Sequence, residues 1–580
     1  MTTISADAPP ELPGHPPARI RRLRPTRPGP RTLTLLAVCL VVLYLVAVPM
    51  LFLLRDAFLE DGSLTLDGFS GAFGGAGTGS MVANTLVFAL GSTALGMVLG
   101  TVLAYVATRT DSPFQRLIYA SSLIPLIIPS ILYAPAWVFL TSRDIGLFNE
   151  IADQLVGARP FNVYSMAGMV WVQGLHIAPI AFLFMVAAFR AMDPSLEEAA
   201  RTSGASRLAV LRRVTLPLSR PGMAGAALIL FVQSLEVFEI PALLGLPADI
   251  SVMTSQMYEL FQTYPIDFQA VGAIGVTLLA VACLGVWLAS RTGGSVKQSA
   301  TVSGKAFRPR RVELGRARPW VASLVALYFL VVVALPVGVL VYASLLPYYE
   351  TPSADAFGAM SFGNYESILN DPTVLQAFSN TILLGLGAAL IVMVLSAIAS
   401  WLVVRTRVPG RSLLDAAAFS PIVVPGLVLG LAIGFVYLHV RLPIYATLWI
   451  ILIAYVTRFL PYGMRYASAA MKSVSPELEE SAYVSGAGWL TTVRRILLPL
   501  TSPGMIAGFV YVMVVSFREL QSTILLYSPG KETVSVLVWE EYQNGGLPQV
   551  AAIGVLLVLV LLAFVGLALA VGGRKGVRIQ

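Results

Sequence analysis

Charged side chains are scarce in this sequence. Asp, Glu, Lys and Arg make up 12% of the 580 residues, hydrophobic residues make up 57%, and the mean hydropathy is +0.78. Soluble globular proteins carry about 25% charged residues. So low a charge content argues against a soluble enzyme, and it also argues against a nucleic-acid partner, although the net charge is +8. The chain is predicted to be an all-α polytopic membrane protein embedded in the lipid bilayer.

Cysteine and the usual sequence signs of catalysis are also lacking. Cys39 and Cys283 lie in apolar runs, where we interpret them as packing or lipid-facing residues. They supply neither a disulfide framework nor a metal-ligand spacing. No Gly-x4-Gly-Lys-Ser/Thr loop is present to hold the phosphates of ATP, and no triad, zinc cluster or carboxylate pair stands out. We therefore predict no catalytic residue and no cofactor bound by this chain, and the sequence leaves a metal site open.

The chain contains about twelve apolar segments that are long enough to cross a membrane, since about 20 helical residues span the hydrocarbon core. The first segment is interpreted as a retained helix, because a cleavable signal peptide has a shorter apolar core. The predicted spans are 33–54, 81–108, 114–141, 164–190, 222–246, 269–290, 319–346, 374–404, 411–438, 443–470, 503–527 and 549–572.

The distribution of Lys and Arg predicts the orientation of these spans. Basic residues concentrate in the N-terminal segment 1–31, in the segment 291–318 and in the C-terminal segment 573–580, whereas the loops 55–80 and 347–373 contain acids and almost no Lys or Arg. Basic loops stay on the cytoplasmic side of a membrane. Both termini are therefore predicted to be cytoplasmic, and the Pro- and Arg-rich N-terminal tail is predicted to be disordered.

The second half of the chain repeats the first. Asn84-Thr85 recurs 296 residues later as Asn380-Thr381, and Pro194 recurs 282 residues later as Pro476. The difference between the offsets places a 14-residue excess in the first half, near 142–163. Six spans in each half make the repeats parallel, related by a pseudo-two-fold axis along the membrane normal. The predicted units are a first repeat at 32–290 (core 81–290), a basic linker at 291–318 and a second repeat at 319–572 (core 374–572), with about five spans of each half in the core.

The best-matched segments lie between the fourth and fifth spans of each half. They are the first coupling loop, 193–220, and the second coupling loop, 475–502, and each is predicted to be a helix–turn–helix. Asp193 and Ser475 are placed as N-caps before a proline at the first helical position. Gly204 and Gly486 are placed where the first helix ends with a positive φ. A compact surface element joined to two spans can transmit a push from a partner into the bundle.

These loops resemble the EAA loop of ABC importer permeases, in a form with two repeats fused in one chain. The resemblance implies that each loop docks into a groove of a separate ATP-hydrolysing subunit, two such subunits in all, and that ATP is used there. It also implies a solute-binding protein outside the membrane and a bacterial plasma (inner) membrane location. Ser481 departs from the family's alanine, which leaves docking plausible because both residues are small. Six residues are carried over from the family's motif: Glu198, Ala199, Gly204, Glu480, Ser481 and Gly486. The full set of candidate coupling residues is Glu197, Glu198, Ala199, Ala200, Gly204, Leu216, Pro217, Glu479, Glu480, Ser481, Ala482, Gly486, Leu498 and Pro499.

The layout is most similar to that of ferric-iron transport permeases, through its Asn-Thr helix starts, its paired prolines in the third spans and the stretch 239–244. Importers of thiamine, phosphonate or polyamines look similar. An alternative of another class is a secondary transporter driven by an ion gradient, which would show parallel halves but no docking loop. A channel or a structural scaffold would explain neither the repeat nor the loops.

Several charged or titratable residues lie inside the predicted spans, where a charge costs about 2.5–3.5 kcal/mol, and six of them fall in matching regions of the two halves. We interpret them as lining the translocation path along the axis. The alternative is that they pair with one another, for example Glu519 with Arg518. His439 and Tyr462 are interpreted as packing residues. The candidate path residues are His176, Glu236, Glu239, Arg458, Arg518 and Glu519.

Overall fold

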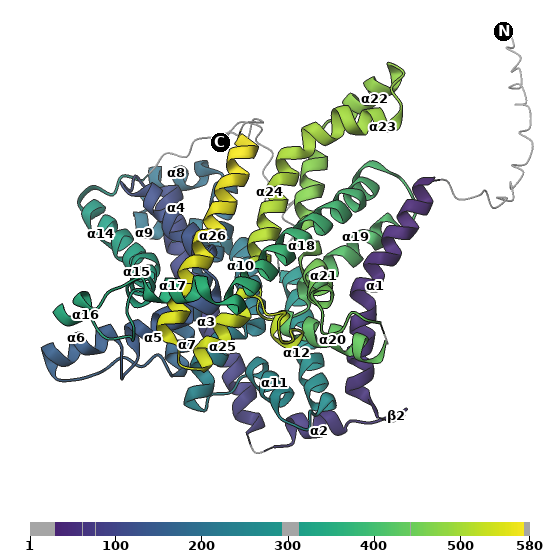
Figure 1. The fold of residues 1–580 in the computed structure, drawn as a ribbon. Helices are drawn as coiled ribbons and strands as arrows, with labels where there is room; N and C mark the ends of the chain where they lie inside the picture. Colours follow the sequence, from purple (N-terminus) through teal and green to yellow (C-terminus); the bar gives the residue numbers. More distant parts are fainter. Residues whose placement is uncertain (1–29, 61, 76, 293–311, 441, 574–580) are drawn as a thin grey trace, which may run out of the picture.

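The structure is a computed structural model that describes residues 30–60, 62–75, 77–292, 312–440 and 442–573 (Figure 1). The tail predicted to be disordered, most of the 291–318 linker and nearly all of the C-terminal tail lie outside these residues. Within the described part the fold is helical apart from a hairpin of two short strands, β1 (Leu59–Glu60) and β2 (Ser63–Leu64). The predicted all-α membrane architecture is confirmed.

The long helices of the two halves follow the same order. The first half contains α1 (Pro30–Phe58), α3 (Thr78–Arg109), α4 (Gln115–Leu123), α5 (Ser130–Thr141), α7 (Met166–Ala191), α10 (Leu216–Glu236) and α12 (Phe268–Thr292). The second contains α14 (Arg318–Phe329), α15 (Leu335–Ser344), α18 (Pro372–Arg405), α19 (Arg411–Phe419), α20 (Gly426–His439), α21 (Leu448–Ser473), α24 (Leu498–Phe517) and α26 (Leu547–Gly573).

Shorter helices join them. They are α2 (Asp67–Phe73), α6 (Leu147–Val156), α8 (Pro194–Thr202), α9 (Arg207–Val210), α11 (Met253–Gln262), α16 (Ala354–Gly358), α17 (Gly363–Asn370), α22 (Pro476–Val484), α23 (Trp489–Thr492) and α25 (Val534–Gln543). The segment with the predicted 14-residue excess forms α6.

The number of membrane-crossing helices is close to the prediction. Among the described residues 9 helices are long and apolar enough to cross a membrane, or up to 11 when two bent helix pairs each count as one span. The bent pairs are α4–α5 and α19–α20, which turn by 109° and 111° just before Ser130 and Gly426. Pro129 and Pro425 precede these turns, where a proline cannot continue a straight helix. The remaining predicted span, 443–470, corresponds to α21, which carries Arg458 and Arg465.

Two predicted spans have different boundaries in the structure. The spans predicted at 222–246 and 503–527 are continuous helices over Arg207–Glu236 and Trp489–Phe517. Each helix begins inside the coupling loop and ends before the charged residues that follow. The apolar composition continues past Glu236 and Phe517, so hydropathy alone placed the ends too late. Non-helical backbone inside a membrane protein is tolerated where it is buried in protein or lines a cavity.

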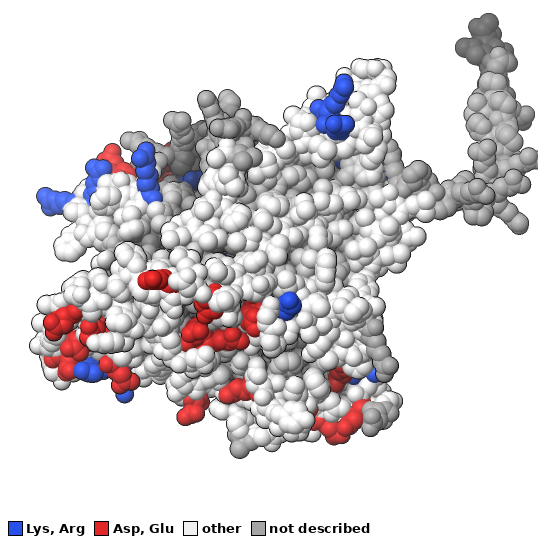
Figure 2. Space-filling view, in the orientation of Figure 1, with Lys and Arg blue, Asp and Glu red and all other residues white. Residues whose placement is uncertain are grey.

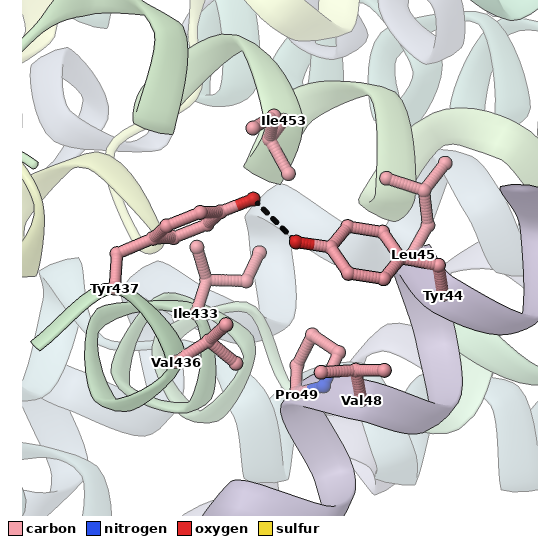
Figure 3. A pocket seen from close by; sticks show the side chains of 8 residues that line it. All are labelled: Tyr44, Leu45, Val48, Pro49, Ile433, Val436, Tyr437 and Ile453. Carbon is pink, nitrogen blue, oxygen red and sulfur yellow. Dashed lines mark hydrogen bonds between the residues drawn. The ribbon is translucent and has the colours of Figure 1, made fainter. Parts of the chain in front are cut away.

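The first span of each half packs against the opposite half. Helix α1 contacts α19 and α20 of the second half, and α14 and α15 contact α4 and α5 of the first half. Figure 3 shows one such contact, where Tyr44 Oη and Tyr437 Oη lie 3.1 Å apart. The cavity between these two helices is about 10 Å³, enough for one water molecule at most and too small for a solute.

Lys and Arg gather mainly at the end of the bundle that carries α8 and α22, and Asp and Glu mainly at the opposite end (Figure 2). We call these the basic end and the acidic end. Helices α2, α6 and α11 lie at the acidic end (Figure 1).

The repeated Asn-Thr pairs hold the helices that follow the fifth span. Thr85 Oγ1 accepts a hydrogen bond from the Met253 N–H (3.0 Å), and Thr381 Oγ1 accepts one from the Val534 N–H (2.9 Å). These bonds fix the starts of α11 and α25. The pairs do not open their helices as the sequence suggested, because α3 begins at Thr78 and α18 at Pro372.

Candidate functional site: two anchored loops and an axial charge cluster

Each coupling loop forms the predicted helix–turn–helix. In the first, the Asp193 carboxylate accepts a hydrogen bond from the Ser195 N–H (2.9 Å). In the second, Ser475 makes no such cap, because its hydroxyl donates to Glu477 Oε2 (2.9 Å). Gly204 and Gly486 adopt φ of +85° and +82°, and an added Cβ would meet nothing within 4 Å at either position. The need for glycine is therefore conformational rather than steric.

The second helix of each loop is continuous with the fifth span. The connection passes through a π-helical turn at Leu211–Thr215 in the first half and at Val493–Leu497 in the second. Pro217 and Pro499 follow these turns, and a proline clashes with the carbonyl four residues before it in a regular α-helix. The wider π turn relieves that clash without breaking the helix. Each half thus has a rigid lever, a continuous helix that runs from the loop into the bundle; Leu216 and Pro217 lie in the first lever, and Leu498 and Pro499 lie in the second.

Buried arginines attach both loops to the bundle. Arg109 Nε lies 3.6 Å from Glu197 Oε1, and the same guanidinium donates to the Phe189 carbonyl (2.8 Å). In the second half Arg405 Nε lies 3.1 Å from Glu479 Oε1, and its guanidinium donates to the Met471 carbonyl (2.7 Å).

Each arginine therefore joins three helices of its half. It ends α3 or α18, its carbonyl partner lies near the end of α7 or α21, and its glutamate partner lies in the loop helix α8 or α22. Arg109 and Arg405 correspond at the offset of 296, and their partners correspond at 282. Sequence reasoning missed both arginines, although each ends a matched helix at the basic end.

The predicted coupling residues divide into two groups. Glu197 and Glu479 point inward to the arginines and are half-buried. The other group is exposed on the outside of the loops: Glu198, Ala199, Gly204, Glu480, Ser481 and Gly486. Ala200 and Ala482 are half-buried beneath them. The exposed group is the part of each loop that a partner can reach.

The axial charges form a cluster in which most members are paired. Arg458 Nε lies 3.3 Å from Glu519 Oε2, and its Nη2 donates to Gln521 Oε1 (2.8 Å). Gln521 in turn donates to Glu239 Oε2 of the other half (3.4 Å). Glu239, Glu519 and Gln521 are all less than a tenth exposed. The pairing reduces the cost of burying these charges.

Gln521 was not predicted because it is uncharged. It is the counterpart of Glu239 at the offset of 282, so the two residues meet across the pseudo-two-fold axis. A comparison of polar residues at corresponding positions of the two repeats would have identified Gln521.

The other candidate path residues surround this cluster. Arg518 donates to the Leu126 carbonyl and so also joins the two halves. His176 lies beside Tyr133, with the ring centroids 5.3 Å apart. Glu236 is the last residue of α10. Tyr462 contacts the ring of Tyr511, and His439 lies 3.7 Å from Asp56, so both make ordinary neighbour contacts.

A glycine makes room for the arginine of the cluster. A Cβ added to Gly426, at the start of α20, would overlap Arg458 Nη1 and come within 2.6 Å of Gln521 Oε1. In the first half the corresponding position is Ser130, and the shorter His176 takes the place of Arg458. Within the described residues no group of three or more His, Cys, Asp or Glu is placed to hold a metal ion.

Comparison with known proteins identifies the family. The family model for the binding-protein-dependent transport system inner membrane component matches residues 94–292 and 404–574, more than half of the chain. The chain belongs to this family. It is a two-repeat permease of the ABC import class, and both matched ranges contain a coupling loop.

Several relatives are permeases of bacterial uptake systems. Ferric transport system permease protein FbpB of Actinobacillus pleuropneumoniae is 24% identical over 541 residues, covering 92% of this chain and 77% of that protein. Fe(3+)-transport system permease protein FbpB 2 of Haemophilus influenzae is 25% identical, covering 83% and 87%. A crystal structure of a bacterial ABC transporter that imports alginate aligns with a TM-score of 0.39 and 22% identity, over 45% of this chain and 94% of that one.

Proposed function

We propose that this permease imports ferric iron across a bacterial inner membrane, with its basic end in the cytoplasm. In this proposal two ATP-hydrolysing subunits dock on the coupling loops, and a solute-binding protein delivers iron at the acidic end. The observation that carries the coupling role is the anchored lever, which occurs twice with the same residues. An arginine, a glutamate and a backbone carbonyl hold each loop, and a continuous helix leads from each loop to the axis.

The mechanism that these contacts support is alternating access. At the acidic side the halves contact each other through Tyr164 Oη and Tyr542 Oη (3.3 Å) and through the rings of Phe238 and Trp539 (centroids 5.1 Å). At the basic end α8 and α22 stand apart (Figure 1). This arrangement fits a state open toward the cytoplasm. ATP-driven approach of the two subunits would bring the loops together and, through the levers, separate the contacts at the other side.

Iron is proposed as cargo because permeases named for ferric transport match nearly the whole chain, first repeat and second repeat together. A diacetylchitobiose uptake permease, NgcG of Streptomyces coelicolor, matches 51% of this chain. Thiamine, phosphonate and polyamine uptake remain competing cargoes for the test below.

The test is uptake by proteoliposomes that contain the permease and its ATPase, supplied with loaded binding protein. We expect ATP-dependent accumulation of ferric iron and none of thiamine, phosphonate or putrescine. Gly204→Pro with Gly486→Pro should abolish uptake, because proline cannot adopt the positive φ of these sites. Gly225→Ala is the matched control, since a Cβ there meets open space within a helix. Uptake that proceeds without nucleotide, driven by an ion gradient, would contradict the proposal.

A further inference from the structure

Among the exposed positions at which the two coupling loops differ, three exchange a charged or polar side chain for an apolar or aromatic one. Arg201, Thr202 and Arg207 of the first loop are replaced at the offset of 282 by Tyr483, Val484 and Trp489 of the second. All six side chains are exposed. The difference therefore lies on the part of each loop that a partner meets, while the anchoring residues beneath are the same.

The first loop is the more basic one. Its segment 194–220 holds five arginines and two glutamates, and one of these, Glu197, is already paired with Arg109. Arg201 and Arg207 lie with Glu197 and Glu198 around a shallow hollow of about 30 Å³ beside Val312, and Glu197 is the glutamate that Arg109 already neutralises. Two arginines at the rim of a hollow favour acidic side chains on whatever covers them.

The second loop is apolar where the first is charged. Its segment 476–502 holds two arginines and three glutamates. Val484 is 90% exposed, Tyr483 42% and Trp489 46%, on helices that project from the basic end (Figure 1). The Trp489 ring is held against Trp401, with centroids 5.5 Å apart in an edge-to-face arrangement. An exposed cluster of large apolar side chains, one of them held in place, marks a protein contact.

Two large apolar positions on the short loop helices are exposed in both loops. Leu196 and Leu208 correspond to Leu478 and Leu490, and all four are about half or more exposed. A groove that accepts either loop must therefore offer an apolar floor to these leucines. The differing positions would then meet the rim of that groove.

We propose that the two coupling loops bind the ATPase subunits through different forces, an inference that rests on the proposed function. The first loop docks by charge, with Arg201 and Arg207 against acidic side chains at the groove rim. The second docks by apolar contact, with Tyr483, Val484 and Trp489 against apolar side chains at the groove rim. The complementary partner surface is an apolar groove with an acidic rim.

Salt separates the two modes, because exposed charge contacts are screened at high ionic strength and apolar contacts are not. The experiment uses full-length permease in nanodiscs and the ATPase subunit that co-purifies with it, expressed separately. Binding of that subunit is measured at about 50 and about 500 mM NaCl. Each loop is observed alone, in a Gly486→Pro background for the first and a Gly204→Pro background for the second, so that two-point attachment does not mask the difference.

For the first loop, we expect binding to weaken by about tenfold from low to high salt, and Arg201→Gln with Arg207→Gln to remove that dependence. Arg201→Lys with Arg207→Lys should keep it, which also shows that the loop still folds. For the second loop, Tyr483→Ala with Trp489→Ala should weaken binding by about tenfold equally at both salt concentrations. Leu208→Ala and Leu490→Ala are the matched control pair and should have equal effects.

Equal salt dependence of the two loops would overturn the inference while leaving the proposed function intact. If Arg201→Tyr with Arg207→Trp makes binding through the first loop as insensitive to salt as binding through the second loop, that result would support the inference. If wild-type permease binds no ATPase subunit at either salt concentration and transports without one, the proposed function fails first.

Discussion

At the basic end the two halves make the same contacts with the same residue types: Arg109 with Glu197, and Arg405 with Glu479. In the axial cluster the halves differ. Arg458 has His176 as its counterpart, and Gln521 has Glu239. Each loop anchor is made within one half, so each half can keep its own copy. On the axis a residue meets its own counterpart, and two facing glutamates would repel each other. Fusion of the repeats in one chain lets one of them become a glutamine that donates to the other.

The largest effect is expected where the halves differ. Arg458→Met would leave Glu519 buried without its cation, at a cost of about 3–5 kcal/mol. We expect a lower unfolding temperature of the purified permease in detergent. His176→Met at the corresponding position should cost much less, because His176 has no carboxylate partner among the ion pairs of the described residues. Equal losses would mean that the two positions are equivalent after all.

Gly426→Ala tests the same difference between Arg458 and His176 by filling the space that the Arg458 guanidinium occupies. The added methyl group would displace the Arg458 guanidinium, which we expect to cost about 1–3 kcal/mol. Ser130→Ala, its counterpart in the first half, should leave the unfolding temperature nearly unchanged. The comparison is made on thermal unfolding curves. A stable Gly426→Ala variant with unchanged uptake would show that the cluster tolerates rearrangement.

The loop anchors should behave alike in both halves. Double-mutant cycles of Arg109→Gln with Glu197→Gln, and of Arg405→Gln with Glu479→Gln, should each give a coupling free energy of about 0.5–2 kcal/mol. Hydrogen exchange of α8 and α22 should rise in the single variants, because each loop loses its attachment. Coupling in one half and none in the other would break the symmetry that the structure shows.

The smallest effect concerns the helix caps. The Ser195 N–H holds the pKa of the Asp193 carboxyl below its usual range of about 3.9. A lowered folded-state pKa adds stability that is present above the unfolded pKa and is lost as the pH falls through the folded pKa. Hydrogen exchange of α8 should therefore increase more than that of α22 below about pH 4, because both loops share a glutamate anchor but only α8 has this cap. Asp193→Ala should remove the difference between the two helices.

Part of this architecture could be predicted from the sequence. The internal repeat, the glycines of the coupling loops and most of the spans could be predicted because they follow from local residue patterns. Gly204 and Gly486 were placed correctly because few other residues accept a positive φ. The ends of the fifth spans were misplaced because apolar residues continue after the helix stops. The Ser475 cap failed because Glu477 competes for its hydroxyl. The packing of α1 on the opposite half has no sequence signal, since helix contacts in lipid depend on shape more than on hydrophobicity.

The packing of each half's first span against the opposite half limits how far the two halves can move apart. Helix α1 is fastened to the second half and α14–α15 to the first. A protease cut between 293 and 311 should therefore leave two fragments that still purify as one particle. The same crossed attachment would let the halves tilt during transport while keeping them from drifting apart in the bilayer.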